Sequence, residues 1–112
     1  MAIDKLMIDN GKKDDGVRHA LANQINELTH YSDYYISSFQ YDPLHFGNVV
    51  VELTDDNFLA RFTFDRGDIF CKKKLLESTQ WIDDQLVYSH STPCNEVYEL
   101  LLKAIRDFLN VV

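Results

Sequence analysis

The sequence predicts a single α+β domain, in which two helices pack on one face of an antiparallel sheet of three to four strands. Two amphipathic stripes, one beginning near residue 17 and one at the C-terminal end, flank short runs rich in β-branched and aromatic residues. Short turns between these runs favour a meander, so the expected order is α-β-β-β-(β)-α. We expect residues 1–16 to form an N-terminal arm or a short strand, and residues 17–112 to form the domain.

The first predicted helix carries one apolar stripe whose members lie three or four residues apart. They are Val17, Ala20, Leu21, Ile25, Leu28, Tyr31 and Tyr35. Asp14 or Asp15 is expected to cap its first turn. The helix should end near residues 37–38, because the turn sequence 40–43 contains a proline, and a loop should then run to Gly47.

The strands are expected after this loop. Residues 49–53 and 58–64 predict a hairpin, since apolar side chains alternate with more polar ones along the second run. Gly67 can take the positive φ of a tight turn, after which residues 69–76 predict a third strand. Residues 85–88 are short and β-prone, and they predict a fourth.

The last helix is expected to start close to Thr92, which can cap it, with Pro93 at its first position. Its apolar stripe should pack into the sheet. The packing residues are predicted to be Val97, Leu101, Ile105 and Phe108.

The chain is acidic, with 11 Lys and Arg residues against 18 Asp and Glu residues and a net charge of -7. This charge repels the phosphate backbone that dominates nucleic-acid affinity, so direct nucleic-acid binding is disfavoured. A basic protein such as a nuclease would be attracted. The start of the chain lacks the features of a signal peptide and no apolar stretch approaches the ~20 residues of a membrane span, so we expect a cytoplasmic protein without membrane contact.

No metal site and no cofactor are expected. His19 and His30 lie about three helical turns apart, roughly 16 Å along the axis, so one ion cannot bridge them. His45 and His90 have no Cys or His at ligand spacing. The sequence therefore indicates a protein without a metal centre.

Cys94 is the one conceivable nucleophile. Its predicted place in the first turn of the last helix would favour the thiolate, and His90 lies four residues upstream as a conceivable base. A passive cysteine at a helix start explains the same position.

The chain also has a run of three lysines, Lys72, Lys73 and Lys74. We interpret them as charges that protect an edge strand, in preference to a phosphate-binding patch.

One aromatic stretch stands out in the middle of the chain. It runs Asp-Asn-Phe-Leu-Ala-Arg-Phe-Thr-Phe-Asp-Arg-Gly-Asp-Ile-Phe over residues 56–70 and is followed by Trp81-Ile82-Asp83. This stretch resembles a pattern in small bacterial immunity proteins associated with polymorphic toxins and contact-dependent growth inhibition. The resemblance implies a cytoplasmic, non-catalytic protein that binds and neutralises a cognate toxin domain, often a nuclease.

Charge and position predict which residues would contact such a toxin, because hairpin turns carry acidic side chains into solvent. The predicted toxin-binding residues are Asp55, Asp56, Asp65, Asp68, Asp83 and Asp84, with Trp81 as an aromatic anchor.

Two other functions stay open. One is a small-molecule or regulatory binding domain with an aromatic pocket made of Tyr31, Tyr34, Tyr35, Phe39 and Tyr41. The other is a small hydrolase that uses Cys94.

Overall fold

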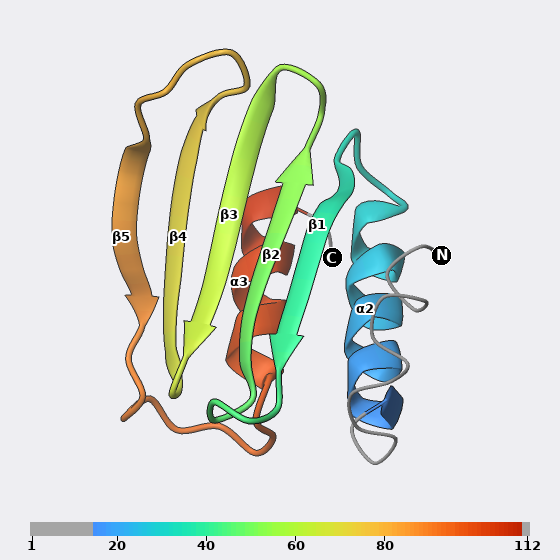
Figure 1. Cartoon of the computed structure of the whole chain (residues 1–112), viewed down its shortest axis with the longest axis vertical. Coiled ribbons are helices and arrows are strands. Elements are labelled where there is room, and N and C mark those ends of the chain that lie inside the picture. Colours follow the sequence, from blue (N-terminus) through green and yellow to red (C-terminus); the bar gives the residue numbers. More distant parts are fainter. Residues whose placement is uncertain (1–14, 111–112) are drawn as a thin grey trace.

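A computed structural model of the chain describes residues 15–110 and contains two helices and five strands. In chain order they are α2 (Asp15–Thr29), β1 (Tyr35–Asp42), β2 (Asn48–Thr54), β3 (Phe58–Asp65), β4 (Asp68–Leu75), β5 (Ile82–Tyr88) and α3 (Glu99–Leu109). The strands form one antiparallel sheet in the order β1-β2-β3-β4-β5 (Figure 1). The predicted α+β meander is confirmed, with five strands in the sheet. The predicted arm lies outside the described residues up to residue 14.

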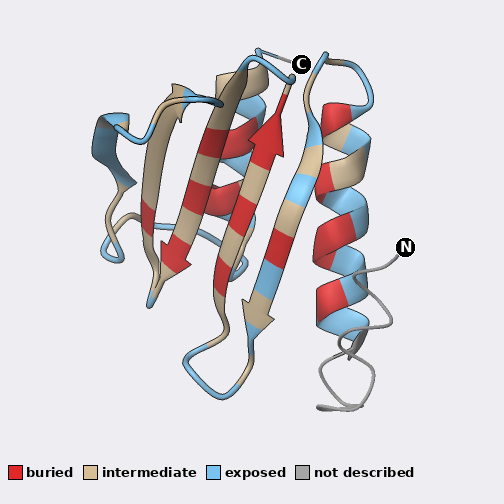
Figure 2. Cartoon of the chain, turned by 45° about the horizontal axis from the view of Figure 1, so that its top comes forward, coloured by how far each residue is buried: buried red, intermediate tan, exposed pale blue. Residues whose placement is uncertain are grey.

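The core lies between the helices and one face of the sheet. Alternate side chains of β2 and β3 point into it, and cross-strand neighbours such as Val51 and Phe62 share that face. Leu101 and Ile105 of α3 are fully buried against the same face, and Ile25 of α2 is fully buried beside β1. Figure 2 shows these buried positions as red bands on β2, β3 and both helices.

The first helix ends earlier than the sequence pattern indicated. It stops at Thr29, and residues 35–42 form strand β1 instead of the end of a helix and the start of a loop. Aromatic and β-branched residues such as Tyr35 and Ile36 favour extended backbone, and pairing with β2 outweighs the helical spacing of the apolar residues. Ser32 closes the helix, because its N–H donates to the Thr29 carbonyl.

The last helix begins later than expected. It starts at Glu99, so Thr92 and Pro93 lie in the preceding connection, and Val97 is exposed. The ring of Tyr98 explains this delay, because it packs beneath the sheet and its hydroxyl donates to the Gly47 carbonyl. The chain is therefore held against the sheet before it can turn into a helix.

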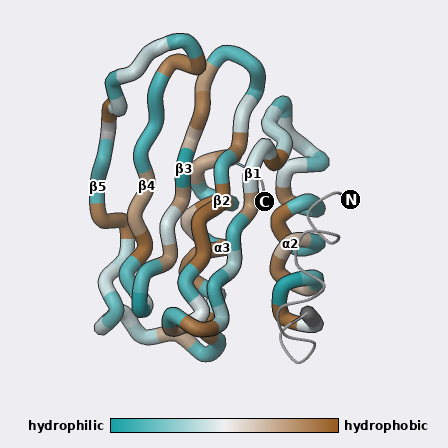
Figure 3. Tube along the Cα trace, viewed as in Figure 1, coloured by the Kyte–Doolittle hydropathy of each residue, from teal (hydrophilic) through white to brown (hydrophobic). Residues whose placement is uncertain are grey.

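The other face of the sheet is not covered by either helix (Figure 1). We call it the open face; it carries the alternate side chains of β3 and β4, including Arg61, Thr63, Phe70, Lys72 and Lys74. Figure 3 shows that β4 changes from hydrophobic to hydrophilic along the chain, as residues 69–71 give way to Lys72, Lys73 and Lys74. Because β4 lies between β3 and β5, the edge-strand explanation of its lysines is wrong.

Candidate functional site

The turn between β1 and β2 presents two large apolar side chains to solvent. Leu44 is 87% exposed and Phe46 is 71% exposed. The turn is held in one shape, because Asp42 Oδ1 accepts the Leu44 N–H at 3.2 Å and Asp42 Oδ2 lies 2.6 Å from His45 Nδ1. Exposed apolar side chains on a fixed turn are typical of the anchors in protein interfaces.

The backbone of this turn is strained where it displays the aromatic ring. Phe46 has a φ of 61° and Gly47 a φ of 66°, both in the left-handed region. For a bulky residue such as Phe46 this conformation costs about 1–3 kcal/mol, and strain of this kind is concentrated at functional sites. Gly47 admits no side chain, since a Cβ there would lie 2.6 Å from the Tyr98 hydroxyl.

The turn between β3 and β4 is locked to the first one. Arg66 and Gly67 have φ values of 52° and 94°, which is the geometry of a two-residue hairpin turn. Asn48 joins the two turns, because its Nδ2 donates to Asp65 Oδ1 at 3.2 Å and its Oδ1 accepts the Arg66 N–H at 2.9 Å. The Arg66 guanidinium also lies 5.3 Å from the centroid of the Phe46 ring.

Asp68 ties this turn to the connection before α3. Its Oδ1 accepts the His90 N–H at 2.6 Å and lies 3.0 Å from His90 Nδ1. These contacts, the ring contact first, hold the pKa of Asp68 below its ordinary value. We call the surface formed by Asp42, Leu44, Phe46, Asp65 and Asp68 the loop end.

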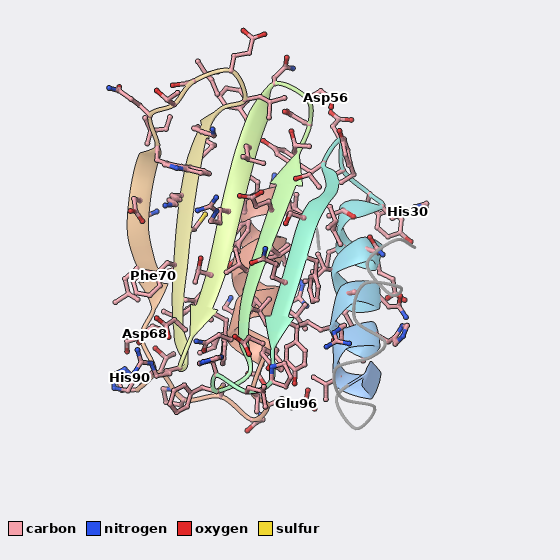
Figure 4. All side chains as sticks on the ribbon, viewed as in Figure 1. His30, Asp56, Asp68, Phe70, His90 and Glu96 are labelled. Atoms are coloured by element: carbon pink, nitrogen blue, oxygen red, sulfur yellow. The ribbon has the colours of Figure 1, made fainter. Side chains whose placement is uncertain are left out.

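The predicted acidic residues fall into separate groups. Asp65 and Asp68 belong to the loop end, whereas Asp55 and Asp56 lie in the turn at the opposite end of β3 (Figure 4). An eight-residue strand spans roughly 25 Å, so these two pairs do not share one binding surface. The single acidic face expected from the sequence is therefore not formed.

Asp55 and Asp56 shape their own turn. Asp55 Oδ1 accepts the N–H groups of Asn57 and Phe58 at 2.9 and 2.8 Å, and the Phe58 bond is the main reason that the pKa of Asp55 is lowered. Asp56 has a φ of 75° and accepts a 2.6 Å hydrogen bond from the Tyr35 hydroxyl. Turn geometry accounts for both carboxylates.

Trp81 and Asp84 belong to a third region, the open face. The centroid of the Trp81 ring lies 4.7 Å from the Arg61 guanidinium, 4.7 Å from Lys72 Nζ and 5.2 Å from Lys74 Nζ. The predicted aromatic anchor is thus half-buried among cations. Asp84 lines a neighbouring hollow, and Asp83 is its neighbour in β5.

The aromatic residues proposed as a pocket point to different surroundings. Phe39 is part of the core, Tyr34 packs edge-on against Phe108 at 5.2 Å, and Tyr31 is highly exposed. Tyr35 bonds Asp56 across the surface. These residues therefore do not form the common pocket that the sequence suggested.

The expected helix-start position of Cys94 is wrong, because Cys94 is exposed in the connection that precedes α3. His90 directs its ring to Asp68, and this removes the geometric basis for a Cys94 and His90 pair. Among the side chains that the structure describes, which leave out those of Asp15 and Asp83, no group of three or more His, Cys, Asp or Glu is placed to hold a metal ion.

Sequence reasoning missed Leu44 and Phe46. Their signal was present, since a Leu and a Phe flank His45 in a loop that has no strand or helix to bury them. Their exposure depends on the turn geometry, which only the folded chain reveals.

The chain matches no protein-family model, no curated protein and no solved structure. Neither helix in the described part of the chain is long and apolar enough to cross a membrane. The site must therefore be interpreted from its own geometry.

Proposed function

We propose that this protein is a non-catalytic inhibitor of the immunity-protein type, which binds a basic toxin domain, such as a nuclease, in the cytoplasm. The observation that carries the proposal is the pair of exposed anchors, Leu44 and Phe46, on a strained and rigid turn. Interface hot spots are large side chains that a partner can enclose completely. A turn fixed before binding also loses little conformational entropy when the partner docks.

The charge around these anchors indicates the sign of the partner. Asp42 lies in the turn that carries the two apolar side chains, Asp65 and Asp68 flank the neighbouring β3–β4 turn, and Arg66 lies against the Phe46 ring. A rim of carboxylates accelerates association with a basic surface and does less to slow dissociation. A nuclease offers such a surface where it holds nucleic acid. Covering that surface would block the enzyme without any chemistry by the inhibitor.

The test is co-expression with the toxin domains encoded next to this gene, followed by measurement of survival, nuclease activity and binding kinetics. We expect a basic domain to bind and to lose activity. Replacing both Leu44 and Phe46 with Ala should weaken binding by at least about 2 kcal/mol, roughly thirtyfold, mainly through faster dissociation. Val97→Ala is the matched control, because Val97 is also exposed but lies outside the loop end.

The acidic residues provide a second comparison within the same experiment. The double substitution Asp65→Asn and Asp68→Asn should slow association and flatten its salt dependence. The double substitution Asp55→Asn and Asp56→Asn, at the other end of β3, should leave both unchanged. If the two variants behave alike, the loop end is not the toxin-binding surface. If no neighbouring basic domain binds the wild-type protein, the proposed function is wrong.

A further inference from the structure

The open face gathers cations around the only tryptophan of the chain. Arg61 lies directly opposite Lys72 in the β3–β4 register, and Lys74 follows two residues later on the same face. All three lie within 5.2 Å of the Trp81 ring centroid. Like charges placed directly opposite each other destabilise a sheet, so this grouping has a cost that the fold itself does not require.

The cluster is also unusual for such an acidic chain. Five of the eight Lys and Arg residues between positions 15 and 110 lie in residues 58–75, where only Asp65 and Asp68 are acidic. This hairpin therefore has a balance of five positive against two negative charges, or +3, within a described chain of eight against fifteen, or -7. Three of these five cations, Arg61, Lys72 and Lys74, lie on the face that neither α2 nor α3 covers.

Contacts within the protein account for part of this charge. Glu52 Oε2 accepts bonds from Arg61 at 2.8 Å and 2.7 Å, and Lys74 Nζ donates to the Ser78 carbonyl at 2.9 Å. With Asp84 included, the Trp81 end of this face carries three cations and two carboxylates, a balance of +1, while Asp65 and Asp68 lie on the same face at the other end of the hairpin. That balance suits a single carboxylate, whereas a nucleic-acid strand would bring several phosphates towards a chain of net charge -7.

Beside Trp81 lies a place where such a group would fit. A shallow hollow of about 250 Å³ is lined by Arg61, Thr63, Phe70, Lys72 and Asp84. Two cations and a hydroxyl can bond a carboxylate there, while the Phe70 ring offers an apolar wall. The edge strand β5 borders the hollow, and its Leu86, which pairs with Phe70, is half-exposed.

We propose that the open face docks an extended, acidic segment of a partner protein, with one Asp or Glu side chain in the hollow and apolar side chains against Phe70 and Leu86. This surface adjoins the loop end, since Thr63 and Phe70 lie two residues from Asp65 and Asp68, but its charge is of opposite sign. Extended segments place alternate side chains on one face, which suits a carboxylate flanked by apolar residues. The protein would then have two interaction surfaces for two kinds of partner.

The test uses Trp81 as its own reporter, because no other tryptophan contributes to the fluorescence. The probe is an alternating Glu-Val peptide, and an alternating Gln-Val peptide is its uncharged control. We expect a saturable change in Trp81 fluorescence with the first peptide and none with the second. Lys72→Gln should weaken binding about tenfold, whereas Lys103→Gln on α3 should not change it.

Three outcomes would overturn the proposal. Equal binding of the Gln-Val peptide would remove the role of the carboxylate. Saturation by free glutamate in the same concentration range would indicate a small-molecule site. Tighter binding of a single-stranded oligothymidylate than of the Glu-Val peptide would indicate a nucleic-acid surface. Circular dichroism of the Lys72→Gln protein separates a lost contact from a lost fold.

Discussion

The loop end and the open face differ in which of their side chains have no evident role in the fold. At the loop end most carboxylates have local tasks, since Asp42 shapes its own turn and Asp68 holds His90. There the apolar side chains Leu44 and Phe46 are the anomaly. On the open face the aromatic ring has close neighbours, and the anomaly is the set of cations around it.

This difference teaches how to read a surface. A charged residue that bonds within the fold needs no partner to explain it, although its charge still acts on a molecule that approaches. What the fold leaves unexplained is two exposed anchors at one surface and the cations around Trp81 at the other. We can therefore test whether Leu44, Phe46 and the cations around Trp81 have a structural role.

The largest effect is expected in the shared framework. Leu101→Ala removes a fully buried side chain from α3 and should lower the free energy of unfolding by about 2–5 kcal/mol. Leu44→Ala removes the same atoms from an exposed position and should change stability by less than about 0.5 kcal/mol. Urea denaturation measures both. A large loss for Leu44→Ala would mean that this side chain stabilises the fold and is not reserved for a partner.

The next effect concerns the side chain that joins the two turns. Asn48→Ala removes the hydrogen bonds to Asp65 and Arg66 and should cost about 1–3 kcal/mol of stability. It should also weaken toxin binding, because the turn that carries Phe46 loses its link to the β3–β4 turn. Thr63→Ala, on the open face, is the control for toxin binding. Unchanged affinity for Asn48→Ala would show that the turn does not need this rigidity.

The sequence predicted most of the fold because hydrophobic alternation is a local signal. The hairpin of β2 and β3 follows from side chains that alternate between the core and the open face. Residues 35–38 were assigned to the helix because Tyr35 continues its apolar spacing, and residues 40–42 to a turn because Pro43 follows them. Pairing with β2 makes both parts one strand. The start of α3 depends on Tyr98 reaching Gly47, a contact between residues 51 positions apart that no local pattern encodes.

The candidate site was less predictable for the same reason. The acidic residues were found by composition, but the sequence cannot say that Asp55 and Asp68 lie at opposite ends of the sheet until the strand register is known. Trp81 was identified as an anchor, whereas its cations come from β3 and β4 and meet only in the folded sheet.

A smaller effect should appear at acidic pH. The pKa of Asp55 is lowered from its ordinary value of 3.8, chiefly by the Phe58 N–H, so the unfolded chain binds this proton more readily than the folded one. The stability that Asp55 contributes is therefore present above about pH 4 and lost as the pH falls through the lower folded-state value. Asp55→Ala should lose less stability between about pH 5.5 and about pH 2.5 than the wild type.

Asp68 gives the corresponding test at the loop end, since its pKa is lowered in the same direction by His90. Asp68→Ala should flatten the same acid limb. Glu77→Ala, at an exposed position between β4 and β5, serves as the control. Urea midpoints across this range decide the matter, and identical acid limbs for all four proteins would contradict both assignments.

The smallest expected effect separates the ion pairs of the two surfaces. Arg61 and Glu52 are partly buried on the open face and joined by two short contacts, whereas Arg66 and Asp65 are more exposed and form one contact at 3.2 Å. Exposed pairs contribute about 0.2–1 kcal/mol, so a double-mutant cycle should give a coupling near the upper end for Arg61 with Glu52 and near zero for Arg66 with Asp65. Glu52→Gln and Asp65→Asn preserve side-chain size, whereas Arg61→Gln and Arg66→Gln shorten the side chain and keep it polar. Arg66→Gln also keeps a non-glycine residue at this positive φ. A larger coupling at the loop end would mean that its charges stabilise the fold, and the carboxylate rim could then no longer be assigned to a basic partner. A coupling of zero for Arg61 with Glu52 would mean that Glu52 does not hold Arg61 in place, and the Arg61 guanidinium would then be free to bond a partner's carboxylate.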